Sequence, residues 1–291
     1  MADPDVAAEP SWSHRTASIN GIQLHFVEAG TGLPVVLLHG FPEFWYSWRH
    51  QIPALAAAGL RVVAPDQRGY NRSDKPAGIS AYKLDMLADD VLGLADALGR
   101  QRFAVVGHDW GGVVAWQLAT RNPERIARAA ILNAPHPATM RRYARGHPSQ
   151  ALKSWYVGFF QLPVIPEQAL RAGGFWGLRR ALRRTSRAGT FTGEDFRRYG
   201  EAWAQPGALT AMLNWYRALR LPSSSTASAR IRVPARVIWG DRDAFLERGL
   251  ADSAVALCDD AEVIHLPEAS HWLHHQEPER VNRLLTEFLA G

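Results

Sequence analysis

Short apolar runs rich in β-branched residues recur along the chain. Their length and composition are typical of strands that are buried on both faces of a sheet. Helical patterns lie between them, and the clearest places leucine or valine at positions 84, 87, 91, 94 and 98 before Gly99. Strands that alternate with helices predict a mostly parallel sheet with helices on both faces. The predicted strands are Val35–Leu38, Val62–Ala64, Phe103–Val106, Ala129–Leu132, Val237–Trp239 and Val263–Leu266.

Two further runs near the beginning of the chain, Thr16–Ile19 and Gln23–Val27, flank the dipeptide Asn20-Gly21. An Asn-Gly pair between two such runs is a strong signal for a β-hairpin, because both residues tolerate positive φ. The hairpin adds two strands and makes one edge of the sheet antiparallel. We therefore predict an α/β fold with a mostly parallel, eight-stranded sheet.

The strand pattern stops after Asn133 and resumes only at Ala235. The interval is rich in helix formers, aromatic residues and arginine, which indicates a helical insertion. We predict an α/β core formed by residues 1–137 and 231–291, and a helical cap over residues 138–230. Proline residues are expected to break the cap into separate helices. They are Pro163, Pro166 and Pro206.

Composition excludes several classes of protein. With 47% hydrophobic and 21% charged residues, the 291-residue chain falls outside the range of disordered proteins. The single cysteine, Cys258, excludes an internal disulfide and a cysteine-based metal site. No apolar run approaches the roughly 18 residues that a membrane-spanning helix needs, and the first residues do not resemble a signal peptide. We expect a cytoplasmic protein with no membrane partner.

Charge is distributed unevenly along the chain. The formal net charge is +5, and the predicted cap holds 15 basic residues against 4 acidic ones. A basic surface of this kind could bind nucleic acid or an acidic partner. We interpret the arginines as a solvated helix face instead, and expect no nucleic-acid partner and a monomer or homodimer.

The segment VVGHDWGG at residues 105–112 carries the most specific chemical signal. A predicted strand runs into small residues that surround Asp109, and a helical pattern follows. This arrangement resembles the nucleophile elbow of the α/β-hydrolase superfamily, with aspartate in the place of the usual serine. A carboxylate, with a reference pKa of about 3.9, is ionised at neutral pH and can attack carbon directly. Its electrophile is then an epoxide carbon or a carbon that bears a halogen. The other interpretation of Asp109 is a helix N-cap.

The resemblance implies an acid and a base after later strands, in the order nucleophile, acid, histidine. Asp243 in the segment WGDRDAF and His271 in PEASHW occupy these positions. Asp241 is interpreted as a turn residue. The other histidines near the C-terminus are expected to be structural or solvated, and they are His265, His274 and His275.

The segment HGFP at residues 39–42 follows the first parallel strand and is similar to the HGxP loop of the superfamily. In that family the loop helps to form the oxyanion hole. The backbone amides of Phe41 and Trp110 are therefore the candidate donors to a developing oxyanion.

Two tyrosines in the cap place the chain nearer to one branch of the superfamily. Tyr156 in SWYVGFF and Tyr216 in NWYR match the cap tyrosines of epoxide hydrolases, which hold the epoxide oxygen. A tyrosine, with a reference pKa of about 10, remains a proton donor at neutral pH. From about residue 12 to residue 290, the sequence resembles an epoxide hydrolase. The resemblance implies that Asp109 opens a small apolar epoxide and that His271, oriented by Asp243, activates water, with no metal and no cofactor.

Haloalkane dehalogenases form the alternative, since they share the fold and the aspartate nucleophile. In them a tryptophan after the nucleophile donates its indole N–H to the halide, so Trp110 fits both families. Their HGNP loop supplies a second donor through asparagine, whereas this chain has Phe41. Fluoroacetate-type enzymes place arginines where this chain has Trp110 and Val113. Epoxide hydrolysis is therefore the favoured prediction, with substrate-binding roles for Trp110, Tyr156 and Tyr216.

Overall fold

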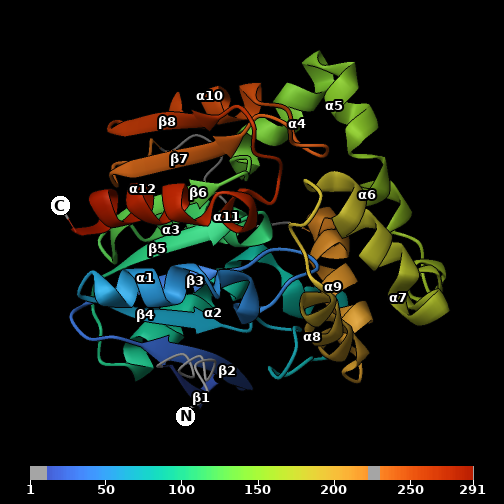
Figure 1. Ribbon diagram of the computed structural model, residues 1–291, viewed down its shortest axis with the longest axis horizontal. Coiled ribbons are helices and arrows are strands. Elements are labelled where there is room, and N and C mark those ends of the chain that lie inside the picture. Colours follow the sequence, from blue (N-terminus) through green and yellow to red (C-terminus); the bar gives the residue numbers. More distant parts are fainter. Residues whose placement is uncertain (1–11, 222–229, 291) are drawn as a thin grey trace, which may run out of the picture.

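A computed structural model describes residues 12–221 and 230–290 and contains a single eight-stranded sheet (Figure 1). The strand order is β1-β2-β4-β3-β5-β6-β7-β8. The predicted eight-stranded α/β sheet is thereby confirmed, and each predicted strand extends by one or more residues. The strands are β1 (Ser13–Ile19), β2 (Ile22–Ala29), β3 (Leu33–Leu38), β4 (Leu60–Pro65), β5 (Phe103–His108), β6 (Ile126–Leu132), β7 (Ala235–Gly240) and β8 (Ala261–Leu266).

The sheet is antiparallel only at the edge that begins with β1. Strands β1 and β2 form the predicted hairpin, and β2 is also antiparallel to β4, while every other pair is parallel. Asn20 and Gly21 connect the hairpin with φ angles of 48° and 77°. Both angles are positive, as the tight turn requires.

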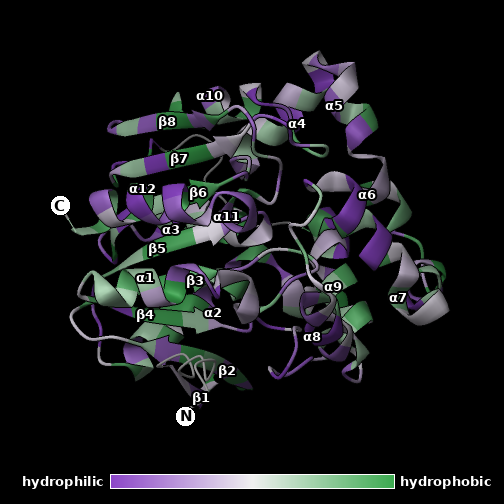
Figure 2. Cartoon of the chain, in the orientation of Figure 1, coloured by the Kyte–Doolittle hydropathy of each residue, from purple (hydrophilic) through white to green (hydrophobic). Residues whose placement is uncertain are grey.

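Helices cover both faces of the sheet, as the alternating pattern predicts. Helices α1 and α12 pack together on one face, and α2 and α3 pack together on the other. Figure 2 shows hydrophobic central strands β3, β4 and β5, and helices such as α12 that mix both kinds of residue. The helices that belong to the core are α1 (Gln51–Ala57), α2 (Leu84–Ala97), α3 (Trp110–Arg121), α10 (Gly249–Val255), α11 (Leu273–Gln276) and α12 (Pro278–Ala290).

Among the described residues, six α-helices follow β6 and precede β7, where the sequence predicts the cap. In Figure 1, α6 to α9 lie to the right of the sheet, past the ends of its strands. Residues 222–229, which precede the predicted end of the cap at residue 230, lie outside the described residues, and the domain boundaries remain a prediction. The inserted helices are α4 (Pro137–Gly146), α5 (Pro148–Lys153), α6 (Trp155–Phe159), α7 (Ile165–Thr185), α8 (Gly193–Ala204) and α9 (Ala208–Arg217).

The predicted break at Pro166 is wrong. Pro166 lies in the first turn of α7, where the missing N–H of proline is not needed by the helix. The helix is interrupted later instead, with non-helical backbone angles from Ala172 to Phe175. Pro163 and Pro206 do separate helices, as predicted.

Within the described residues, no helix is both long and apolar enough to span a membrane.

The loops that carry the predicted catalytic residues lie at one end of the sheet, where its parallel strands finish. Asp109 follows β5, Asp243 follows β7 and His271 follows β8. Because these strands are parallel, their carboxyl ends lie at the same end of the sheet, where α/β proteins commonly bind ligands.

Candidate active site

Asp109 occupies a sharp turn between β5 and α3, with φ at 51° and ψ at −121°. Such a conformation is strained for a residue with a side chain and persists only where the surroundings hold it. Two glycines permit the turn. A Cβ on Gly107 would lie 2.2 Å from the carbonyl oxygen of Gly111, and a Cβ on Gly111 would lie 2.0 Å from that of Leu38. The turn therefore needs glycine at both positions.

The carboxylate of Asp109 contacts the loop that follows β3. Among the described residues, the side chain makes no capping hydrogen bond to α3. Its Oδ1 accepts a hydrogen bond from the backbone N–H of Phe41 at 2.9 Å. Asp109 therefore stands in the N-cap position of α3, but its side chain does not cap the helix.

His271 lies between two carboxylates. Its Nε2 is 3.5 Å from Oδ2 of Asp109, and its Nδ1 is 2.7 Å from Oδ2 of Asp243. Asp243 is fixed in turn, because it accepts hydrogen bonds from the Asn133 side chain at 2.6 Å and the Phe245 backbone at 2.7 Å. The three predicted residues come together in the order that a nucleophile, base and orienting acid require.

The charges of the site are strongly coupled. Burial alone would lower the pKa of His271, but the charges of Asp243 and Asp109 outweigh burial and raise it. Burial would raise the pKa of Asp243, yet the nearby His271 and the hydrogen bonds from Asn133 and Phe245 lower it. In the free protein, an imidazolium between two carboxylates is therefore favoured.

Of the two candidate oxyanion donors, the backbone amides of Phe41 and Trp110, the first makes a hydrogen bond to Asp109. Trp110 is the first residue of α3, where backbone N–H groups have no partner within the helix. The role of Trp110 as the second donor stays a prediction.

A cavity of about 590 Å³ opens above Asp109. Asp109, Trp110, Tyr156 and Tyr216 all line it, together with apolar side chains that include Leu246. The rings of Tyr156, on α6, and Tyr216, on α9, lie 6.0 Å apart. Burial and then the charge of Asp109 raise the pKa of both tyrosines, so both hydroxyls stay protonated at neutral pH. The structure thus places two proton donors and one carboxylate in one apolar cavity.

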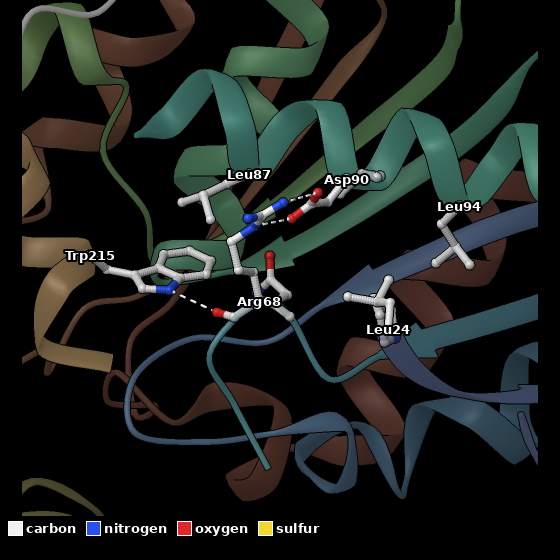
Figure 3. A pocket seen from close by; sticks show the side chains of 9 residues that line it. Leu24, Arg68, Leu87, Asp90, Leu94 and Trp215 are labelled. Carbon is white, nitrogen blue, oxygen red and sulfur yellow. Dashed lines mark hydrogen bonds and ion pairs between the residues drawn. The ribbon is translucent and has the colours of Figure 1, made fainter. Parts of the chain in front are cut away.

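Helix α9 is fastened to the core beside Tyr216. The indole N–H of Trp215 donates to the carbonyl oxygen of Arg68 at 3.0 Å. Arg68 is itself held by Asp90, whose two oxygens each accept a guanidinium hydrogen bond at 2.6 Å. Figure 3 shows this buried ion pair and the indole among leucine side chains. Trp215 also contacts Trp110 edge to face, at 5.7 Å between ring centroids.

Residues that sequence analysis set aside do lie outside this cavity. Asp241 pairs with His265 at 2.5 Å. His274 and His275 are buried, so they are structural and not solvated. They surround Glu43, a residue whose importance the sequence alone did not reveal. Its partners come from segments more than 60 residues away, and no local pattern links them.

Comparisons with known proteins identify the family of the fold. The alpha/beta hydrolase fold family matches residues 34–278. The AB hydrolase superfamily protein YfhM of Bacillus subtilis is 50% identical over 274 residues, which cover 94% of this chain and 96% of that protein. Epoxide hydrolase A of Mycobacterium tuberculosis is 37% identical, with 96% of this chain and 98% of that protein covered.

Solved structures of epoxide hydrolases are also similar to this chain. The crystal structure of an epoxide hydrolase from Bacillus megaterium with an inhibitor superimposes with a TM-score of 0.88 and 31% sequence identity. The match covers 95% of this chain and 100% of that chain. The fold is therefore shared over nearly the whole length of the chain.

Replacement of Gly111 by alanine should destabilise the protein by about 1–3 kcal/mol or more, because the added Cβ meets backbone atoms that cannot move freely. Gly146, at the end of α4, is the control, since a Cβ there meets no atom within 4 Å. Urea unfolding of both variants measures the difference. Equal stability of Gly111→Ala and Gly146→Ala would contradict the packing argument.

Removal of the Asp109 carboxylate should lower the pKa of His271, because one of the two negative charges that favour the imidazolium is lost. A fall of about 1 to 3 pH units is expected in Asp109→Ala. NMR titration of the His271 ring protons measures it, with Asp241→Ala as the control. An unchanged pKa in Asp109→Ala would show that Asp109 and His271 are not coupled.

Proposed function

The chain belongs to the epoxide hydrolase branch of the α/β-hydrolase family, and we propose that it converts an epoxide and water to a vicinal diol through a covalent ester on Asp109. The observation that carries the mechanism is a carboxylate, not a hydroxyl, at the turn after β5, next to His271 and below two tyrosine hydroxyls. Cytoplasmic location and a monomeric or homodimeric state remain predictions from the sequence.

In the first step, a carboxylate oxygen of Asp109 attacks one epoxide carbon and the ring C–O bond breaks. Tyr156 and Tyr216 donate hydrogen bonds to the epoxide oxygen, and one of them supplies the proton that the departing alkoxide needs. The apolar cavity favours this step, because hydrogen bonds to a developing charge are stronger where water is excluded. The products of the step are a hydroxyl group and an alkyl ester of Asp109.

In the second step, water attacks the ester carbonyl carbon. Esterification removes the charge of Asp109, which is one of the two charges that raise the pKa of His271. His271 therefore becomes a stronger acid at that stage, and its proton passes through solvent to the tyrosinate that ring opening left, which restores the tyrosine. The neutral imidazole then takes a proton from water. The N–H of Phe41, with Trp110 as the proposed second donor, stabilises the oxyanion. Collapse of the intermediate releases the diol and restores the carboxylate.

The substrate is proposed to be a small apolar epoxide. The lining of the cavity supports this, since most of it is aromatic or aliphatic. Its volume lies within the roughly 300–1,000 Å³ that is typical of small-molecule sites. No cofactor is required by the two steps, because every proton and charge is handled by the residues named above.

Asp109→Ala should abolish diol formation from styrene oxide while the protein stays folded. The variant loses the only proposed nucleophile, so the rate should fall by about a factor of 10⁴ or more. Asp241→Ala, which removes a carboxylate that pairs with His265, is the control and should keep its activity. Diol is measured by chromatography and fold by circular dichroism.

Two results would count against the proposal. Substantial turnover by folded Asp109→Ala would remove the nucleophile assignment. Halide release from a chloroalkane by the wild-type protein, without diol formation from any epoxide, would favour dehalogenation.

Phenylalanine at Tyr156 or Tyr216 should slow ring opening by about 10²- to 10³-fold, the usual effect of losing one donor to a developing charge. The double variant should be nearly inactive. Tyr143→Phe is the matched control, because Tyr143 stacks on His147 outside the cavity. Single-turnover kinetics separates ring opening from ester hydrolysis. A double variant with the wild-type rate of ring opening would assign the two tyrosines to packing alone.

A further inference from the structure

A second group of ionisable side chains lies inside the core and does not line the catalytic cavity. It consists of Glu43 in the loop after β3, His108 at the end of β5 and His274 on α11. Their exposed fractions are 1%, 0% and 0%. One ligand atom from each residue lies within 4.8 Å of the ligand atoms of the other two.

The hydrogen bonds of this group are distributed unevenly. Oε1 of Glu43 accepts from the Tyr199 hydroxyl at 2.6 Å and lies 2.7 Å from Nε2 of His275. Among the described residues, Oε2 of Glu43, Nδ1 of His108 and both nitrogens of His274 have no hydrogen-bond partner. Fully buried polar atoms without a partner are rare and costly, so these atoms need an explanation.

The position of the proton on the His108 ring follows from the contact that Nε2 makes. Nε2 lies 2.8 Å from the backbone carbonyl oxygen of His271. A carbonyl oxygen can only accept, so Nε2 carries the proton. In the neutral ring, Nδ1 then presents a lone pair to Oε2 of Glu43, which is 3.4 Å away. Two acceptors that face each other in the core repel unless a cation lies between them.

A proton and a metal ion predict different distances. A protonated histidine draws a carboxylate to about 2.7–2.9 Å, and His271 does so with Asp243 in this protein, at 2.7 Å. The two distances to Oε2 of Glu43 are 3.4 Å from His108 and 3.6 Å from His274. The edge of a tetrahedron with bonds of 2.0–2.1 Å is about 3.3–3.4 Å. In addition, of the four unpartnered atoms one shared proton would serve two, whereas one metal ion would serve three and leave Nδ1 of His274.

We propose that Glu43, His108 and His274 bind a divalent metal ion, for which Zn²⁺ is the best match. One carboxylate and two imidazoles form a known type of zinc ligand set, and a water molecule can complete the tetrahedron. Two of the three ligands also have fitting outer contacts, because the His271 carbonyl orients His108, and Tyr199 holds Glu43. Among the described residues, Nδ1 of His274 has no such partner. The ionisation states agree with this role. Burial lowers the pKa of His274, and the surrounding imidazoles overcome burial to hold the pKa of Glu43 well below its usual value.

The metal would brace the active site without taking part in the reaction. Each ligand stands close in sequence to a residue of the catalytic machinery, and the pairs are Glu43 with Phe41, His108 with Asp109 and His274 with His271. A metal ion that joins the three ligands therefore ties together the oxyanion loop, the nucleophile turn and the loop of the base. It should stabilise the fold, because the unfolded chain has no preformed site.

The test uses untagged protein, so that no affinity resin supplies or removes metal. Protein produced with added zinc should contain about one zinc per chain by mass spectrometry of the elements. Chelation should lower the melting temperature, and added Zn²⁺ should restore it. Titration of the chelated protein with Co²⁺ alone should give the strong visible absorption of a tetrahedral site.

Two variants identify the ligands. His274→Gln should lose the zinc and the cobalt absorption, whereas His275→Gln, a change at the next residue of α11, should keep both. The proposal would be overturned if the protein contained no zinc, if its melting temperature did not change with chelators or Zn²⁺, and if Co²⁺ gave no visible absorption. A proton shared within the group would then be the remaining explanation. Retention of metal by folded His274→Gln would equally contradict it. If His274→Gln does not fold, the zinc content and cobalt spectrum of the wild-type protein still decide.

Discussion

The position of one imidazole between two carboxylates governs the proposed chemistry. His271 lies 3.5 Å from Asp109 and 2.7 Å from Asp243; His271 and Asp243 are buried, and Asp109 is partly exposed and lines the cavity. In such surroundings the charge of each group depends on the charges of the other two. Esterification of Asp109 therefore also changes the protonation of His271. It converts a site that favours an imidazolium into one that releases a base at the stage when water must be activated.

The backbone keeps these groups in place at some cost in strain. Asp109 has a positive φ, and the close approach of backbone atoms around it tolerates only glycine at positions 107 and 111. The tyrosines are positioned from the opposite side of the cavity. Trp215 ties α9 to the carbonyl of Arg68, and the Arg68–Asp90 ion pair holds that segment against α2. Core and inserted helices thus meet around Asp109 through specific contacts.

Much of this arrangement could be predicted from the sequence, because it depends on local patterns. Buried parallel strands are short apolar runs, and the turn around Asp109 needs small residues at fixed positions. The order of Asp109, Asp243 and His271 after successive strands was enough to predict their meeting at one sheet edge. The Glu43 group was not predictable in this way, since its members come from three distant segments and none carries a motif for that contact. The interruption of α7 near Gly173 was not predictable in this way either, because Pro166 is the stronger helix-breaking signal in the sequence.

The central claim is that Asp109 forms a covalent ester that His271 helps to hydrolyse. The most direct test is the intact mass of His271→Gln after incubation with styrene oxide, followed by peptide mapping, with a chloroalkane in a parallel sample. The account predicts an adduct equal to the whole mass of the epoxide, located on Asp109. An alkyl adduct from the chloroalkane alone would assign the protein to dehalogenation, and an adduct on any other residue, or on none, would contradict the account.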